Sequence, residues 1–219
     1  MKHLKKLLVA LPVLLQAPVA GAQDLPWSFG ATLTSNYVVY GISQTGGGAA
    51  FQPWIQYSKG PFYAGVWMSN VSLAPDSIET DLYLGFAGDL PGSSGLGYDL
   101  AYYRYYYNST GDAGGELIAK LSWAPSDSSS IVITGKNGLA GGPTTGIFGF
   151  GYDFANGYGL SGEIGSVFTA GGAQFWNFGV SIPLNDAVGL DIRAHDSNTT
   201  TPVATVAISW SGDFSGLFK

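Results

Sequence analysis

The sequence has no cysteine, few charged residues and, after residue 22, no long apolar run. Without cysteine it has neither a disulfide framework nor a thiolate ligand or nucleophile. Charged residues make up 11% of the chain, whereas a water-soluble domain usually has about 25%. No apolar run beyond residue 22 reaches the roughly 20 residues of a transmembrane helix. Lysine and arginine are too few and too scattered for a nucleic-acid partner.

The first 22 residues have the pattern of a secretory signal peptide. Three lysines precede a short apolar stretch from 7 to 20, and Ala20-Gly21-Ala22 fits an A-x-A cleavage site. We therefore expect a mature chain that starts at Gln23; an uncleaved membrane anchor is disfavoured because the stretch is short. Cleavage removes three of the nine cationic residues and none of the fifteen acidic ones, so the formal charge becomes six minus fifteen, or −9.

The rest of the chain is rich in glycine and aromatic residues and alternates with period two. At 187–195, Leu190 and Ile192 share one parity, whereas Asp191 and Arg193 share the other. The same alternation occurs at 78–86, 116–123, 158–168 and 175–182, and more weakly near 27–40, 50–58, 62–72, 98–107, 131–136, 146–154 and 203–211. The pattern predicts about twelve strands in one transmembrane barrel over 23–219, because a closed barrel satisfies its backbone groups while every second side chain faces lipid.

The connections between these strands are of two kinds. Tight-turn residues occur at 59–61, 89–92, 125–127, 156–157 and 183–186. Longer loops rich in Gly, Ser and Thr occur at 42–49, 73–77, 108–115, 137–145, 169–174 and 196–202. The alternation predicts an all-β, antiparallel up-and-down barrel of a Gram-negative outer membrane, with short periplasmic turns and longer extracellular loops. On this interpretation, 38–40 end the first strand and 41–45 leave the membrane.

The polar parity of the strands predicts which residues line the barrel interior. Because acids outnumber bases there, a pore would prefer cations weakly. In the tyrosine-rich segment 102–107, a symmetric turn would point Arg104 inward and three tyrosines outward into an aromatic girdle, and a sugar-stacking platform is the alternative. The residues expected to line the lumen are Glu79, Asp81, Glu116, Lys120, Lys136, Asp153, Glu163, Asn177, Asp191, Arg193 and His195.

Three segments carry a family resemblance: "SNYVVYGISQT" at 35–45, "FYAGVWMSNV" at 62–71 and "IETDLYLGFAGDL" at 78–90. They resemble the TorF-type family of proteobacterial outer-membrane porins, long described only as a conserved family of unknown function. Tyr40 stands where that family usually has Arg. The resemblance implies an outer-membrane barrel and a channel, and it brings no catalytic residue. The matching residues of the first segment are Ser35, Asn36, Tyr37, Gly41, Ile42, Ser43, Gln44 and Thr45.

We therefore expect a monomeric porin-like channel for passive diffusion of small polar solutes. Its other partners would be outer-membrane lipid and the barrel-assembly machinery, and we expect no cofactor, metal or nucleic acid. Three alternatives stay open: a closed structural or adhesion barrel, a soluble β-sandwich, and an outer-membrane hydrolase. The hydrolase would need His195 beside a serine, with Asn177 and Ser209 on the flanking strands as nearby polar groups.

Overall fold

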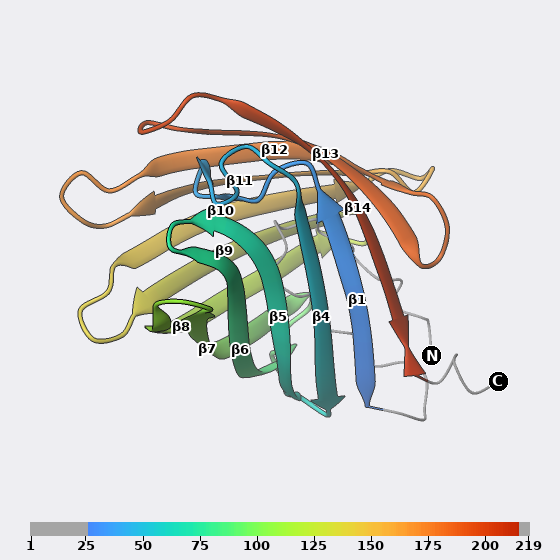
Figure 1. The fold of residues 1–219 in the computed structure, drawn as a ribbon. Helices are drawn as coiled ribbons and strands as arrows, with labels where there is room; N and C mark the ends of the chain where they lie inside the picture. The colour runs from blue at the N-terminus through green and yellow to red at the C-terminus, as the bar shows by residue number, and fades with distance from the viewer. Residues whose placement is uncertain (1–25, 215–219) are drawn as a thin grey trace.

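The computed structural model describes residues 26–214, so the predicted signal peptide and the last five residues lie outside the described part of the chain. Within 26–214 the structure is a closed antiparallel barrel of twelve strands, which confirms the predicted fold class (Figure 1). No helix among these residues is long and apolar enough to cross a membrane. The wall strands are β1 (Trp27–Thr34), β4 (Ala50–Lys59), β5 (Phe62–Leu73), β6 (Asp76–Asp89), β7 (Leu96–Tyr107), β8 (Gly111–Ser126), β9 (Ser129–Gly138), β10 (Thr144–Asp153), β11 (Gly159–Val167), β12 (Gln174–Pro183), β13 (Val188–Ser197) and β14 (Val203–Asp213).

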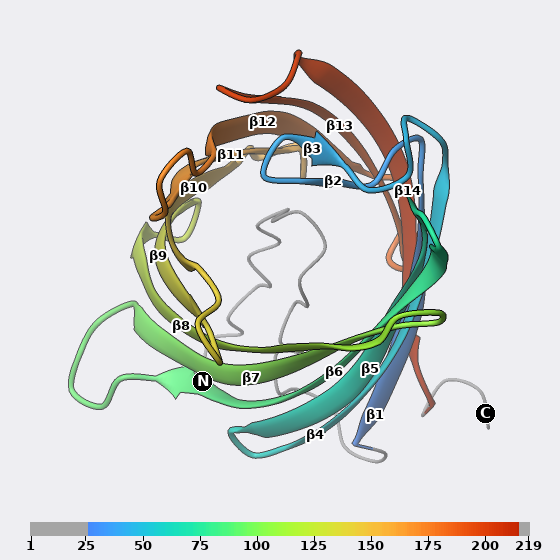
Figure 2. The same ribbon diagram turned by 60° about the vertical axis from the view of Figure 1, so that its left-hand side comes forward.

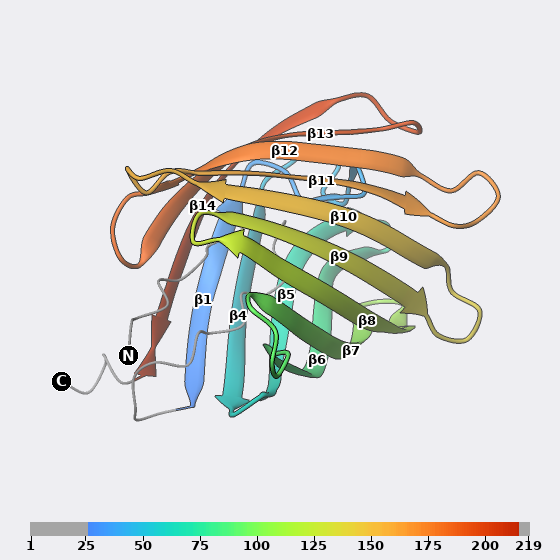
Figure 3. The same cartoon turned by 180° about the vertical axis from the view of Figure 1, so that it is seen from behind.

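Each wall strand pairs with the next wall strand along the chain, and the first strand pairs with the last. Closure runs from Ser28 opposite Asp213 to Thr34 opposite Ala207. Figure 3 shows the wall of β8 to β13, which crosses β1 and β4 obliquely in projection, as the tilt of barrel strands requires. Closure leaves the wall without a free edge, so every wall strand has hydrogen-bonding neighbours on both sides.

The two faces of the barrel wall have opposite character. The outer face carries large apolar side chains such as Leu33, Ile133 and Ile164, which are 56%, 57% and 61% exposed. The inner face carries polar side chains such as Gln52 and Gln56, each 1% exposed. A soluble sheet buries its apolar face, whereas a transmembrane barrel turns that face outward to lipid.

Aromatic rings on the inner face lie over glycines of the neighbouring strands. The ring of Tyr83 lies where a side chain on Gly65 would stand, and the ring of Tyr63 occupies the same place over Gly85. Any Cβ at these two glycines would collide with the ring above it. The inner glycines therefore make room for tyrosines that lie against the wall, so the sheet and its rings form one packed layer.

The first connection departs most from the sequence prediction. The first strand ends at Thr34 rather than near residue 40, and residues 35–49 turn into the barrel instead of forming an extracellular loop. Their short hairpin, β2 (Val38–Val39) paired with β3 (Ile42–Ser43), lies inside the ring of wall strands (Figure 2). We call residues 35–49 the infolded segment. At the same end, β6 and β8 are longer than predicted, so connections 74–75 and 108–110 are short.

Candidate functional site

The inner face of the barrel is the candidate site, because it brings together polar residues from most strands. Strand register and burial place all the side chains expected to line the lumen on this face. They are Glu79 and Asp81 on β6, Glu116 and Lys120 on β8, Lys136 on β9, Asp153 on β10, Glu163 on β11, Asn177 on β12, and Asp191, Arg193 and His195 on β13.

The infolded segment is held by hydrogen bonds among its own polar side chains. Asn36 Oδ1 accepts from Ser43 Oγ at 2.6 Å and lies 3.0 Å from Thr45 Oγ1. Thr45 Oγ1 also accepts from the Tyr37 N–H at 3.2 Å. Asn36 and Thr45 are buried. These contacts join residues seven to nine positions apart and bend the chain back on itself.

The tip of the hairpin places an aromatic ring across the barrel interior. Tyr40 and Gly41 both have positive φ, 52° and 79°, as a two-residue type I′ turn requires. The Tyr40 ring stacks on Phe175 of β12 with centroids 4.6 Å apart, and Lys136 Nζ lies 5.3 Å from its centre. Thr200 Oγ1 donates to the Gly41 carbonyl at 2.9 Å, which ties the tip to the β13–β14 connection.

The family-motif residues therefore have structural roles that the sequence analysis missed. Ser35 Oγ accepts from the Val206 N–H at 3.0 Å where the segment leaves the wall. Asn36, Ser43 and Thr45 form the internal framework described above. The sequence did contain one indication of this hairpin. Short polar side chains cluster around a Tyr-Gly pair, and such a cluster favours a tight local turn. The stacking partner Phe175 is far away in the chain, so no local pattern could show it.

Carboxylates and tyrosines alternate on one side of the interior. Tyr107 Oη donates to Glu79 Oε1 at 3.0 Å, and Tyr105 Oη donates to Glu116 Oε2 at 2.9 Å. Asp81 lies between Trp67 and Tyr105 in the strand register. We call this part of the inner face, on β5 to β8, the acid–tyrosine wall.

The prediction for segment 102–107 was wrong. Asp81 pairs with Tyr105 rather than with Arg104, so the β6–β7 register differs by one residue from that of a symmetric turn. A one-residue shift moves every side chain of a strand to the other face. Tyr103, Tyr105 and Tyr107 therefore point inward, as does Asp99, which accepts from Lys120 Nζ at 3.1 Å. Arg104 points outward and pairs with Asp112.

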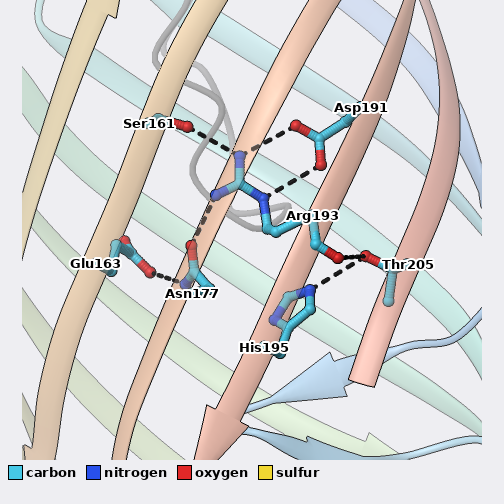
Figure 4. Close-up of polar contacts among 7 residues, drawn as sticks. All are labelled: Ser161, Glu163, Asn177, Asp191, Arg193, His195 and Thr205. Carbon is cyan, nitrogen blue, oxygen red and sulfur yellow. Dashed lines mark hydrogen bonds and ion pairs between the residues drawn. The ribbon is translucent and has the colours of Figure 1, made fainter. Parts of the chain in front are cut away.

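The opposite side of the interior is organised around one arginine (Figure 4). Arg193 donates to both oxygens of Asp191, at 3.1 and 3.0 Å. It also donates to Asn177 Oδ1 at 2.7 Å and to Ser161 Oγ at 2.8 Å. Asn177 in turn donates to Glu163 Oε2 at 2.9 Å. We call this network, on β11 to β13, the arginine wall.

The contacts of His195 do not support the hydrolase alternative. Its Nε2 lies 3.1 Å from Thr205 Oγ1. Ser209, the serine suggested from the sequence, instead lies 3.0 Å from Thr32 Oγ1. Asn177 is directly opposite His195 in the register, but its side chain bonds Glu163 and Arg193. His195 thus contacts a threonine and Ser209 has a different partner, so His195 is not positioned to activate Ser209 as a nucleophile.

The fold is a closed antiparallel barrel of twelve strands. It is similar to a solved structure of a protein named "KdgM porin", with a TM-score of 0.66 and 10% identity over 84% of this chain and 98% of that one. A second structure, "KdgM porin in complex with disordered oligogalacturonate", gives a TM-score of 0.64 at 9% identity, over 84% of this chain and 97% of that one. At sequence identities of 10% and 9%, these structural similarities show a shared fold.

The family is established by sequence. Residues 20–195 match the model of the family described as "Bacterial protein of unknown function (Gcw_chp)", and the chain belongs to that family. No curated protein matches the sequence significantly. The TorF-type name stays a prediction, whereas the porin-like barrel that the resemblance implied is the fold observed.

Proposed function

We propose that the protein is an outer-membrane channel for passive diffusion of small polar solutes and that it prefers cations. The observation that supports this best is a closed barrel with an apolar outer face and an acidic inner wall. The inner face of the described strands includes the carboxylates of Glu79, Asp81, Asp99, Glu116, Asp153, Glu163 and Asp191, and the cations Lys120, Lys136 and Arg193. Carboxylates that line a pore favour cations.

The charge excess is larger than the sequence suggested, because Asp99 points inward and Arg104 outward. Two of the cations are already paired: Lys120 with Asp99 at 3.1 Å and Arg193 with Asp191 at 3.0 Å. Lys136 is then the remaining inner-wall cation among the described strands. Salt screens such charges over about 10 Å at 0.1 M, so the preference should weaken as salt rises.

The oligogalacturonate bound in the KdgM complex does not belong to the solute class that we propose here. Oligogalacturonate is a chain of carboxylates and therefore a polyanion. An inner wall on which carboxylates exceed cations would repel it, since like charges across a narrow lumen destabilise each other. The two barrels share a fold, and the inner-wall charge of this chain argues for solutes of the opposite sign.

The infolded segment would act as the constriction of this channel. Its ring at Tyr40 reaches Phe175 on β12, and Tyr37 packs on Trp67 of β5 with centroids 5.5 Å apart. The segment thus contacts two opposite parts of the wall. A solute passing through the barrel would have to pass between this segment and the remaining wall, which would limit solute size.

The cellular context belongs to the same proposal. We propose export through the signal peptide at 1–22, insertion of 23–219 as a monomer by the barrel-assembly machinery, and location in the outer membrane of a Gram-negative bacterium. The apolar outer face and the porin-like fold support the membrane location.

Conductance across a planar lipid bilayer tests the proposal against its main competitor, a closed structural barrel. The infolded segment gives that competitor physical support, because aromatic rings occupy part of the interior. We expect purified protein to give discrete conductance steps, with larger steps when residues 37–47 are deleted. Well-folded protein that gives no steps, with or without that deletion, would show that the barrel is closed.

A further inference from the structure

A group of residues on the acid–tyrosine wall and on β4 beside it has hydrogen-bonding capacity that its protein neighbours do not use. Within residues 26–214, Asp81 Oδ1, Gln52 Oε1 and Trp67 Nε1 are buried side-chain atoms with no hydrogen-bond partner. Asp81 and Trp67 are each 3% exposed, and Gln52 is 1% exposed. Buried polar groups in folded proteins are almost always hydrogen-bonded, so three such atoms close together point to a ligand.

The three residues lie in adjacent rows of the barrel wall. Trp67 on β5 pairs directly with Asp81 on β6. One row nearer the infolded segment, Ser69 pairs with Glu79, and Gln52 Nε2 donates to Ser69 Oγ at 3.4 Å. The free oxygens of Asp81 and Gln52 therefore flank the same stretch of β5, one on each side.

Aromatic rings lie on both sides of Asp81. Trp67 stands on one side of Asp81 and Tyr105 on the other. Tyr37 of the infolded segment meets the Trp67 ring edge-on, with centroids 5.5 Å apart, and so covers the row from inside the barrel. The faces of such rings attract cations, indole most strongly.

Negative charge is in excess here. Glu79 and Glu116 each accept from a tyrosine hydroxyl, at 3.0 and 2.9 Å, so each already has a neutral donor. Asp81 keeps one oxygen without any donor. Lys136, the remaining inner-wall cation of the described strands, has its Nζ over the Tyr40 ring. One ammonium group against three carboxylates leaves room for a second cation.

We propose that Gln52, Trp67, Glu79, Asp81 and Tyr105 form a binding site for the primary ammonium group of a small organic solute. The proposal rests on the proposed channel function, for which it names the solute class. An ammonium group has three N–H donors and no acceptor, which suits the free oxygens of Asp81 and Gln52. The solute's alkyl carbons would pack on the rings. The indole N–H of Trp67 offers a further hydrogen bond to an oxygen of the same solute or to water.

Isothermal titration calorimetry of the purified protein in detergent micelles tests the site without relying on conduction. Three probes with the same four-carbon chain separate the contributions: n-butylammonium, butyltrimethylammonium and butan-1-ol. We expect saturable binding of n-butylammonium. The quaternary probe, which has the charge but no N–H donor, should bind at least about tenfold more weakly, since charge-assisted hydrogen bonds are the strong ones. Butan-1-ol should give no measurable heat of binding.

Two matched substitutions test whether n-butylammonium binds at the acid–tyrosine wall. Asp81→Asn should weaken n-butylammonium binding at least about tenfold, since it removes the carboxylate that keeps a free oxygen. Asp153→Asn makes the same change on the inner face of β10 and should alter binding less than about twofold. Heat-modifiable gel mobility checks that each variant is folded. If Asp81→Asn does not fold, the probe series on the natural protein still decides the question.

The outcomes separate this inference from the proposed function. Equal binding of the primary and quaternary probes, or unchanged binding in folded Asp81→Asn, would overturn the ammonium site even if the barrel conducts. Selective binding by a barrel that gives no conductance steps would support the site and reject the channel.

Discussion

The acid–tyrosine wall and the arginine wall face each other across the barrel interior, and they differ in whether their charged groups have hydrogen-bond partners. On the arginine wall, every polar group of Arg193 has a partner: Asp191, Asn177 and Ser161. On the acid–tyrosine wall, Asp81 keeps a free oxygen. β6 and β12 hold opposite positions in the ring of strands, so the contrast spans the full width of the interior.

The comparison shows that the burial of a charged side chain on the inner wall does not by itself determine its role. Arg193 is 4% exposed and Asp81 is 3% exposed, so the two residues are equally buried. The satisfied network fixes three strands relative to one another, and breaking it should cost stability. The unsatisfied carboxylate contributes little to folding and is available to a solute. Each prediction below tests one part of this contrast.

The largest effect should follow from Arg193→Ala. The substitution leaves Asp191 without its partner and removes donors from Asn177 and Ser161. Removing one partner of a buried ion pair costs about 3–5 kcal/mol. Because the Asp191 side chain is 23% exposed, we expect a loss in the free energy of unfolding at the lower end of that range. Urea titration of the protein in lipid vesicles measures it. A loss below about 1 kcal/mol would show that the arginine wall is not structural.

A charge placed on the outer face of the barrel should lower the free energy of unfolding nearly as much. Val206→Arg places a cation on the outer face of β14, where Val206 is 48% exposed. Arginine on the lipid-facing side costs about 2–4 kcal/mol near the membrane midplane. Ala207→Arg, one residue along the same strand and on the inner face, opposite Asp191, should be much milder. If Ala207→Arg proves the more damaging of the two, the inside and outside faces assigned to β14 are reversed.

A smaller effect should follow from Asn36→Ala in the infolded segment. Its side chain accepts from Ser43 and lies 3.0 Å from Thr45, and each lost hydrogen bond is worth about 1 kcal/mol. We expect a looser segment and a larger, noisier single-channel conductance. Gln44→Ala is the matched control, since the Gln44 side chain makes a local, solvent-exposed hydrogen bond to the Ile42 carbonyl. Equal conductance changes in both variants would mean that Asn36 does not hold the constriction.

The smallest effect on stability should come from Asp81→Asn. Its free oxygen has no donor to lose, and the substitution removes a buried negative charge next to Glu79. We expect the free energy of unfolding to change by less than about 0.5 kcal/mol or to rise slightly. The same urea titration measures it beside Arg193→Ala. A loss comparable to that of Arg193→Ala would remove the contrast between the two walls.

Much of this fold follows from the sequence because barrel strands obey a local rule. Alternation at 187–195 and 78–86 separates inner from outer side chains without any knowledge of neighbours. The register between strands depends on more distant residues: at the β6–β7 turn a shift of one residue reversed the predicted directions of Arg104 and three tyrosines.

The infolded segment could not be predicted for a different reason. Its course depends on Phe175 and Thr200, more than a hundred residues away, which stack on or bond to its tip. Local propensity described residues 35–45 as a strand end and a loop, and tertiary contacts decided where that loop goes. The free oxygen of Asp81 likewise emerges only once the neighbouring strands are in register.

The reversal potential across a planar bilayer under a KCl gradient tests the central claim most directly, because it reports the sign of charge that the interior favours. We predict a modest cation preference that weakens as salt concentration rises. The double variant Glu79→Gln with Asp81→Asn should move the potential toward neutrality. Clear anion selectivity of the natural protein would contradict the account of an acidic inner wall.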